Sequence, residues 1–263
     1  MTAVGAAREA RVVGALGRRA LSVQFRRAQL LMPTFVLPLM LLAVIASGTS
    51  AAQGLRGFPD VSSYLGFVVP GTIVQGALLA GLTSGIALAG DLEFGFFDRL
   101  LAAPVNRTSL ILGRLCGTLG LAVLQTTWFL LIALAFGARY PGGIPGALGA
   151  GVLTALTAAG IGGLACTIAI RTGSMSLMQS VFPFIFVLLF TAPAFFPRAL
   201  LSPALQAIAP FNPLTYVVEG VRALLQDNPA LGDPWLGLLA AVGLAVGATA
   251  LATFALADRL RRT

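Results

Sequence analysis

Six long apolar runs constrain the fold of this chain more than any other feature of its sequence. Runs of about 18 or more apolar residues are typical of helices that cross a lipid bilayer, because their length matches the hydrocarbon core. The mean hydropathy of the whole chain, +0.93, is far above the range of soluble domains. The sequence therefore predicts an all-α polytopic membrane protein with spans at 30–48, 63–90, 110–137, 146–170, 175–193 and 235–256.

The residue types that are missing exclude several classes of function. All 17 basic residues are Arg, and the chain holds neither Lys nor His. Without His there is no His-ligated metal site and no Ser-His-Asp or Cys-His nucleophile. Without Lys there is no GxxxxGK[ST] loop to hold ATP phosphates. Cys116 and Cys166 lie inside apolar runs, and we interpret them as small core residues. We expect no metal and no cofactor on this chain.

The distribution of the Arg residues predicts the topology. They lie in the gaps between apolar runs and form no stripe, which argues against a nucleic-acid partner. With the N-terminus in the cytoplasm, four Arg fall on the outer side: Arg56, Arg139, Arg198 and Arg222. The other 13 fall on the inner side: Arg8, Arg11, Arg18, Arg19, Arg26, Arg27, Arg99, Arg107, Arg114, Arg171, Arg259, Arg261 and Arg262. The positive-inside rule therefore predicts that both termini are cytoplasmic.

Residues 1–29 form a predicted part distinct from the transmembrane part at 30–263. At helical spacing, one side collects Arg8, Arg11, Arg18, Arg19 and Arg26, and another collects Val12, Val13, Leu16, Ala20 and Val23. This pattern predicts an amphipathic helix in the cytoplasmic interface, with its Arg residues on lipid phosphates. The alternative is a basic leader that only fixes the orientation of the chain.

The segment 194–234 is predicted on the outer side, before the last span. Its first part is apolar but holds Pro197, Pro203, Pro210 and Pro213, so we expect short helices that enter the outer leaflet without crossing it. Its second part, 214–226, predicts one short helix with Glu219 and Arg222 spaced i,i+3 for pairing.

The stretch between the second and third spans is unusually rich in charge. Asp98 and Arg99 stand beside Phe96, Phe97, Leu100 and Leu101, and Pro104 follows. A short helix at about 94–103 with an apolar face and flanking charges is suited to docking into a groove of another protein. Glu93 and Arg107 stand on either side of it and are spaced to pair where the chain re-enters the bilayer. The alternative is a loop whose Phe residues only anchor in lipid headgroups.

Two motifs, one between the second and third predicted spans and one before the last span, resemble those of a known family. Glu93, Gly95, Pro104, Arg107, Gly113 and Arg114 resemble the pattern E-x-G…P-x-x-R…G-[KR] of type-2 ABC exporter permeases. The stretch NPLTYVVEGVRALL at 212–225 resembles the segment before the last span in the daunorubicin-resistance branch. The departures are small: Asn106 stands where Ser is common, and Arg114 where Lys is common.

The resemblance implies an ABCG-like, type V exporter fold in a bacterial cytoplasmic membrane. It implies a second permease protomer, identical or paralogous, and a separate ATP-binding subunit that carries ATP and Mg²⁺. The helix near 94–103 is then the coupling helix, with Glu93, Gly95, Phe96, Phe97, Asp98, Arg99, Leu100, Pro104 and Arg107 as its coupling residues. The chain itself is then a transporter subunit and not an enzyme.

The resemblance also places a transport pathway along the second and fifth spans. The candidate pathway residues are Thr72, Gln75, Thr83, Phe182 and Phe186, and the candidate external gate is Phe195 with Phe196. The Thr residues are equally suited to bonding their own helix, and Gln75 to joining helices. These two spans hold no acid or base, which favours a drug, antibiotic or lipid over an ion and argues against proton-coupled transport.

Three other functions compete with this one. Export of a lipid-linked polysaccharide is the first alternative, although the first span offers only Phe35 to an aromatic ring around its channel. A membrane transferase is a weaker one, because Asp91, Glu93 and Asp98 form no convincing Mg²⁺ site. The last is a structural membrane subunit, which has no need of a coupling helix.

Overall fold

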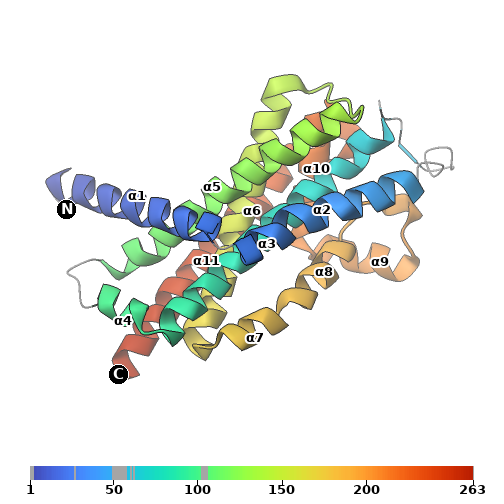
Figure 1. Cartoon of the computed structure of the whole chain (residues 1–263). Helices are drawn as coiled ribbons and strands as arrows, with labels where there is room; N and C mark the ends of the chain where they lie inside the picture. Colours follow the sequence, from blue (N-terminus) through green and yellow to red (C-terminus); the bar gives the residue numbers. More distant parts are fainter. Residues whose placement is uncertain are drawn as a thin grey trace.

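The computed structural model describes residues 3–26, 28–48, 58–59, 61, 63–101 and 106–262. Within these ranges the chain is helical and contains no β-strand. The helices run between two ends of the molecule (Figure 1). We call the end with α1 (Ala3–Arg26), α4 (Phe96–Leu101) and the C-terminus the terminal end. We call the opposite end, with α9 (Pro203–Ile208) and α10 (Pro213–Gln226), the α10 end.

Five helices of the described residues are long and apolar enough to cross a membrane. They are α2 (Ala28–Gly48), α3 (Tyr64–Glu93), α5 (Arg107–Ala135), α6 (Gly143–Thr172) and α11 (Pro234–Arg262). Large apolar side chains are exposed along several of them, including Met40 on α2, Leu131 on α5 and Phe254 on α11. Such surfaces are stable against lipid tails, which need no polar covering. The chain is an all-α polytopic membrane protein.

The predicted fifth span is not one continuous helix. It consists of α7 (Met175–Ser180) and α8 (Phe182–Phe190), which meet at Val181. The stretch from Met175 to Phe190 is about 24 Å long at the rise of an α-helix, less than the roughly 30 Å of the hydrocarbon core. Pro183, in the first turn of α8, has no backbone N–H and cannot continue the hydrogen bonding of α7. The prediction of a single span at 175–193 was therefore wrong in its continuity.

Local signals set the ends of the other helices. The side chains of Ser63, Asn106 and Ser174 accept hydrogen bonds from the first turns of α3, α5 and α7, respectively. Gly173 ends α6 with a left-handed backbone (φ 63°), which a residue without Cβ adopts at little cost. The turn between α6 and α7 is therefore tight, as its sequence RTGS predicts.

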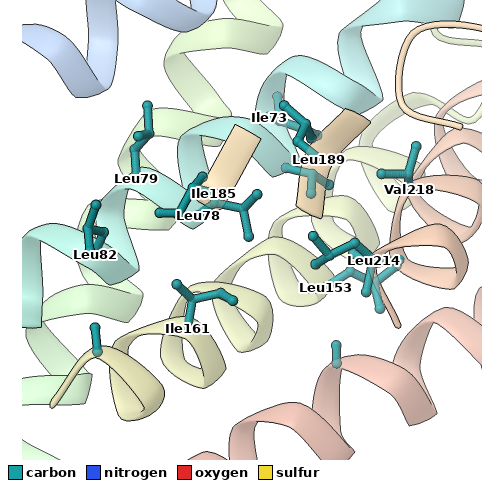
Figure 2. Close-up of a cluster of buried hydrophobic side chains, with 14 of the residues drawn as sticks. Ile73, Leu78, Leu79, Leu82, Leu153, Ile161, Ile185, Leu189, Leu214 and Val218 are labelled. Carbon is teal, nitrogen blue, oxygen red and sulfur yellow. The ribbon is translucent and has the colours of Figure 1, made fainter. Parts of the chain in front are cut away.

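The helix α3 forms the centre of the bundle and is buried along almost its whole length. It packs against α2, α5, α6 and α10. Figure 2 shows its core contacts, which join Ile73 and Leu78 of α3 to Ile185 and Leu189 of α8, with Leu153 of α6 nearby. Close packing depends on Gly81 of α3, where an added Cβ would lie 2.8 Å from the carbonyl oxygen of Ala158 on α6.

The segment between α8 and α11 forms short helices, as its prolines predict. They are η2 (Arg198–Leu200), α9, η3 (Ala209–Phe211), α10 and η4 (Pro229–Leu231). Of these, α10 packs into the bundle against α6 and α11, while Ile208 and Phe211 of α9 and η3 are exposed. The helices α9 and η3 therefore lie at the surface of the α10 end, as expected for helices that do not cross the bilayer, whereas Ala194 and Phe195 before them are buried.

Candidate functional site

The short helix α4 follows a glycine turn at the terminal end. Gly95 has a left-handed backbone (φ 67°), which would cost another residue about 1 kcal/mol. This turn separates α4 from the end of α3 and directs it under α1 (Figure 1). The guanidinium of Arg19 on α1 lies 4.0 Å from the centre of the Phe96 ring, within the range of a cation–π contact. The amphipathic helix therefore contacts the predicted coupling helix.

The apolar face of α4 packs on its own chain. Phe97 is only 2% exposed, and with Leu100 it lines a narrow crevice beside Leu16 of α1 and Leu110 of α5. Phe97 is therefore not available to a partner protein, contrary to the sequence expectation. The exposed aromatic residue here is Phe94, at 75%, which sequence reasoning did not single out.

Other predicted coupling residues lie partly or wholly outside the described structure. Asp98 and Arg99 belong to α4, and Arg107 begins α5, but their side chains are not described. Pro104 lies outside the described residues. Their roles, and the pairing of Glu93 with Arg107, stay predictions.

Glu93 connects the end of α3 to the beginning of α7. Its Oε2 accepts a hydrogen bond of 3.0 Å from the backbone N–H of Met175, the first residue of α7. A carboxylate is favourable at this position, because the first N–H groups of a helix lack partners within the helix. The second predicted pathway element, α7–α8, is thus attached at its start to the segment that leads into α4.

An ion pair joins α3 to α5 at the same end. Arg114 donates from Nη2 to Oδ2 of Asp91, and its Nη1 lies 3.4 Å from the carbonyl oxygen of Ser84. Both ionic side chains are largely buried, at 12% and 13% exposure. The sequence marked both as charged residues next to spans, but not as partners. Opposite charges at the facing ends of consecutive predicted spans are the signal that could have found this pair.

The helix α1 packs closely against the first half of α5. At Gly17 of α1, an added Cβ would lie 3.0 Å from Cβ of Cys116 and 3.2 Å from the carbonyl oxygen of Gly113. Arg11, Arg18 and Arg26 are exposed on the opposite side of α1. The exposure of these three Arg residues agrees with the amphipathic pattern, whereas Arg19 faces Phe96, and the position of α1 in a membrane interface stays a prediction.

The polar pathway candidates of α3 lie inside a single chain. Thr72 and Gln75 are fully buried, and their side-chain polar atoms find no hydrogen-bond partner among the described residues. The Thr83 hydroxyl bonds the carbonyl oxygen of Ala80 in its own helix. Of the three candidates on α3, Thr72 and Gln75 thus carry unused hydrogen-bonding capacity, a property that they share with Ser84 of the same helix.

Four Phe residues form a row along α8 and beyond its end. The ring centres of Phe182 and Phe186 are 5.5 Å apart, those of Phe186 and Phe190 6.4 Å, and those of Phe190 and Phe195 5.8 Å. Of the two gate candidates, Phe195 is buried (2%) and Phe196 is partly exposed (36%). The structure therefore connects the predicted pathway residues of α8 with Phe195, but not with Thr72 or Gln75.

The charges of α10 do not pair with each other. Glu219 accepts a hydrogen bond of 3.2 Å from Arg198, whereas Arg222 donates to three backbone carbonyl groups. The expected Glu219–Arg222 ion pair was wrong, because Arg222 points into the bundle. Burial raises the pKa of the Glu219 carboxyl, against the opposing attraction of Arg198 and Arg222. Burial also lowers the pKa of Arg222 to about 10, so it remains a cation at neutral pH.

The acidic and Cys side chains do not cluster in the described ranges. No group of three or more His, Cys, Asp or Glu residues there could hold a metal ion. The contacts of this site join one helix to another. They are ion pairs, hydrogen bonds at helix ends and aromatic contacts.

The fold and this set of contacts define a multi-pass α-helical membrane protein that carries the short helix α4 at its terminal end. The chain belongs to the ABC-2 type transporter family, whose sequence model matches residues 11–225. This match includes the Glu93 turn, α4 and almost all of α10.

Curated relatives agree with the family. The chain is 31% identical over 218 residues to the "Putative transport permease ycf38" of Porphyra purpurea, covering 82% of this chain and 74% of that protein. The protein of the same name from Pyropia yezoensis is 31% identical over 202 residues, or 76% and 69% of the two chains. The "Daunorubicin resistance ABC transporter permease protein DrrB1" of Streptomyces coeruleorubidus is 25% identical over 188 residues, or 70% and 66%.

Proposed function

We propose that this chain is the membrane-spanning subunit of an ATP-driven exporter for a hydrophobic or amphiphilic compound, such as a drug, an antibiotic or a lipid. A separate ABC-type subunit binds ATP and Mg²⁺ and drives the cycle. A second permease protomer, identical or paralogous, completes the membrane part. The protein lies in a bacterial cytoplasmic membrane with its terminal end, and both termini, in the cytoplasm.

The observation that carries this proposal is the hydrogen bond from Met175 to Glu93. Glu93 ends α3, directly before the two-residue turn into α4, and Met175 begins α7. A push on α4 from an ATPase subunit therefore reaches α7–α8 through one short polar contact. A structural membrane subunit has no need for such a connection.

The surface offered to the ATPase differs from the one expected from sequence. Phe97 and Leu100 anchor α4 to α1 and α5 from the inside. Phe94 stands exposed at the turn and is the aromatic residue that a groove on a partner could receive. The charged residues Asp98 and Arg99 remain candidates for the same interface.

The character of the cargo follows from the row of Phe residues. Phe182, Phe186 and Phe190 offer aromatic surface without any charge along α8, and the buried Phe195 continues their row beyond its end. Such a surface suits an apolar or amphiphilic molecule and offers nothing to a hydrated ion. Gln75 and Thr72 supply the unused hydrogen-bonding groups that a polar part of the cargo requires once α3 becomes accessible.

Purification from the host membrane tests the proposal. The tagged chain should carry an ABC-type ATPase, identified by mass spectrometry, in one-to-one ratio. Phe94→Asp should lower the ATPase recovered by at least about tenfold, because a desolvated aromatic anchor is replaced by a charge. Phe136→Asp is the matched control: Phe136 also directly follows a long helix, is 81% exposed and has nearly the same backbone angles, but lies at the α10 end.

Two outcomes would contradict the proposal. The first is a wild-type complex without any ABC-type ATPase in detergents that preserve other such complexes. The second is equal recovery of the ATPase from the Phe94 and Phe136 variants and the wild type, which would remove α4 from the interface.

Export of a lipid-linked polysaccharide is the second candidate function. The Phe row on α8 favours it, since aromatic rings offer flat apolar faces against which the apolar face of a sugar can pack. Phe35 of α2 does not extend this row, because it packs on Phe129 of α5 with ring centres 6.1 Å apart. This candidate therefore has aromatic surface on one helix only, and we rank it second.

A further inference from the structure

Arg222 is a buried cation that binds backbone carbonyl groups from two different parts of the chain. It is 2% exposed, and no ion pair to it occurs among the described residues. Its Nε donates to the carbonyl oxygen of Phe67 on α3 at 3.2 Å, and its guanidinium lies 4.0 Å from the centre of the Phe67 ring. Its Nη2 donates to the carbonyl oxygens of Pro193 and Ala194 at 2.9 and 2.8 Å.

These contacts hold residues 192–195 directly on α3. Ala192, Ala194 and Phe195 are all buried, although they belong to an irregular segment that follows α8. The backbone of Ala194 approaches Gly71 so closely that an added Cβ there would lie 2.5 Å from the Ala194 oxygen. Irregular backbone at this depth leaves carbonyl groups without helical partners, and Arg222 supplies the donors that they need.

Asn212 holds the adjoining end of α8. Its Nδ2 donates to the carbonyl oxygen of Leu188 at 2.7 Å and lies 2.9 Å from the hydroxyl oxygen of Thr191. Its Oδ1 accepts from the N–H of Leu214 and so begins α10. The same side chain therefore joins the start of α10 to the end of α8. Asn212 and Arg222, ten positions apart, bind consecutive parts of residues 188–195.

We propose that Asn212 and Arg222 are positioning residues that keep the gate segment, residues 188–195, closed on α3 at the α10 end. The role of this segment as a gate rests on the proposed function, whereas the closure rests on the contacts above. When the segment leaves α3, Arg222 loses the Pro193 and Ala194 carbonyls but keeps the carbonyl and ring of Phe67. The cation therefore stays partly bound in the open form, which lowers the cost of opening compared with releasing it entirely.

Thiol accessibility measures this closure directly. The full chain carries Ala194→Cys, which adds one sulfur atom at a position that is 1% exposed, and Cys116→Ala, which removes the exposed native thiol. It is reconstituted in lipid nanodiscs and treated with a water-soluble maleimide. Mass spectrometry of the peptides reports labelling at position 194 and at the native Cys166, which is 0% exposed and shows whether the chain unfolds.

Two variants weaken the closure in different ways. Arg222→Gln removes the guanidinium group, which donates to Phe67, Pro193 and Ala194. Asn212→Asp keeps an oxygen that can accept from Leu214 but removes the amide that donates to Leu188 and Thr191. Each should speed labelling at position 194 by about tenfold, because each removes hydrogen-bond donors that hold residues 188–195. Labelling at Cys166 should stay unchanged. A thiol from Ser202→Cys, at an exposed position, should react equally fast in all backgrounds.

Arg222→Lys tests whether the closure needs the guanidinium, which binds α3 and the gate segment together, or only a positive charge. One ammonium group cannot reach Phe67 and the 193–194 carbonyls in the way that the guanidinium does, so labelling should be nearly as fast as with Gln. Full protection by Lys, or unchanged labelling in both the Gln and Asp variants, would overturn the proposal. Because this assay uses neither ATP nor cargo, its result is independent of whether an ATPase co-purifies. A failure of the proposed function and a failure of the closure are therefore distinguishable.

Discussion

The carboxylate of Glu93 accepts a hydrogen bond from the backbone N–H of Met175 at 3.0 Å, across 82 positions of sequence. The contact joins the end of the most buried helix, α3, to the first residue of α7. It is exposed at the terminal end and rests on a single hydrogen bond, so it can form and break without disturbing the core. This makes it suited to transmitting movement between α4 and α8.

Loss of the Glu93 carboxylate should release the start of α7. In Glu93→Ala, the amide hydrogens of residues 175–177 should exchange about three- to tenfold faster, since one hydrogen bond to a charged group is removed. Glu93→Gln keeps an acceptor oxygen, so its exchange rates should lie between those of the wild type and of Glu93→Ala. Hydrogen–deuterium exchange of the full chain in nanodiscs measures both. Exchange that is the same in all three proteins would show that Glu93 does not fix α7.

The Asp91–Arg114 pair should stabilise the fold mainly by avoiding a lone buried charge. Arg114→Ala should lower the free energy of unfolding by about 2–3 kcal/mol, because it leaves the largely buried Asp91 carboxylate without its cation. The double variant Asp91→Ala with Arg114→Ala should cost less than the sum of the single variants. A double-mutant cycle of denaturant unfolding checks this, and strict additivity would contradict direct coupling.

The Gln75 side chain should lower the thermal stability of the protein while it contributes to export. Both polar atoms of its side chain are buried without a partner among the described residues, so Gln75→Leu should raise the melting temperature by about 2–4 °C, for roughly 1 kcal/mol. The same variant should lower ATP-driven export if the amide meets cargo. Thr83→Val is the control for the melting temperature and should not raise it, because the Thr83 hydroxyl already has a partner in its own helix. A lower melting temperature for Gln75→Leu would mean that the amide has an essential partner.

Glu219 should make the stability of the protein depend on pH. Burial raises its folded-state pKa above the ordinary value of 4.5, so the folded protein holds this proton more tightly than the unfolded chain. The corresponding stability is fully present below about pH 4.5 and is lost as pH rises through the folded-state pKa. Melting temperatures from pH 4 upward should therefore fall more steeply for the wild type than for Glu219→Gln. Parallel profiles would contradict the shift.

The sequence predicted the helices well because lipid imposes a simple rule on them. A long apolar run such as 146–170 has one stable arrangement in a bilayer, and α6 covers it. The same rule fails at Val181, where length and hydropathy cannot reveal that Pro183 begins a separate helix. The division at residue 29 between an amphipathic and a transmembrane part stays a prediction.

Side-chain partners were harder to predict than helices. The i,i+3 spacing of Glu219 and Arg222 suggested a local pair, but Arg222 is held by Phe67 and Ala194, far away in sequence. Phe97 carries the spacing of a docking face, yet the crevice between α1 and α5 covers it. In both cases the outcome depends on how distant helices pack, which the spacing of neighbouring residues does not encode.

The contact between α3 and α6 at Gly81 and Gly85 has a consequence for evolution. Even a methyl group at Gly81 would meet Ile161 at 2.7 Å, and one at Gly85 would meet Ala165 at 2.5 Å. Neither glycine can be replaced by a larger residue without a simultaneous change in the facing helix. Substitutions at this contact should therefore be tolerated only as paired changes, one on each helix, whereas positions away from it can change singly.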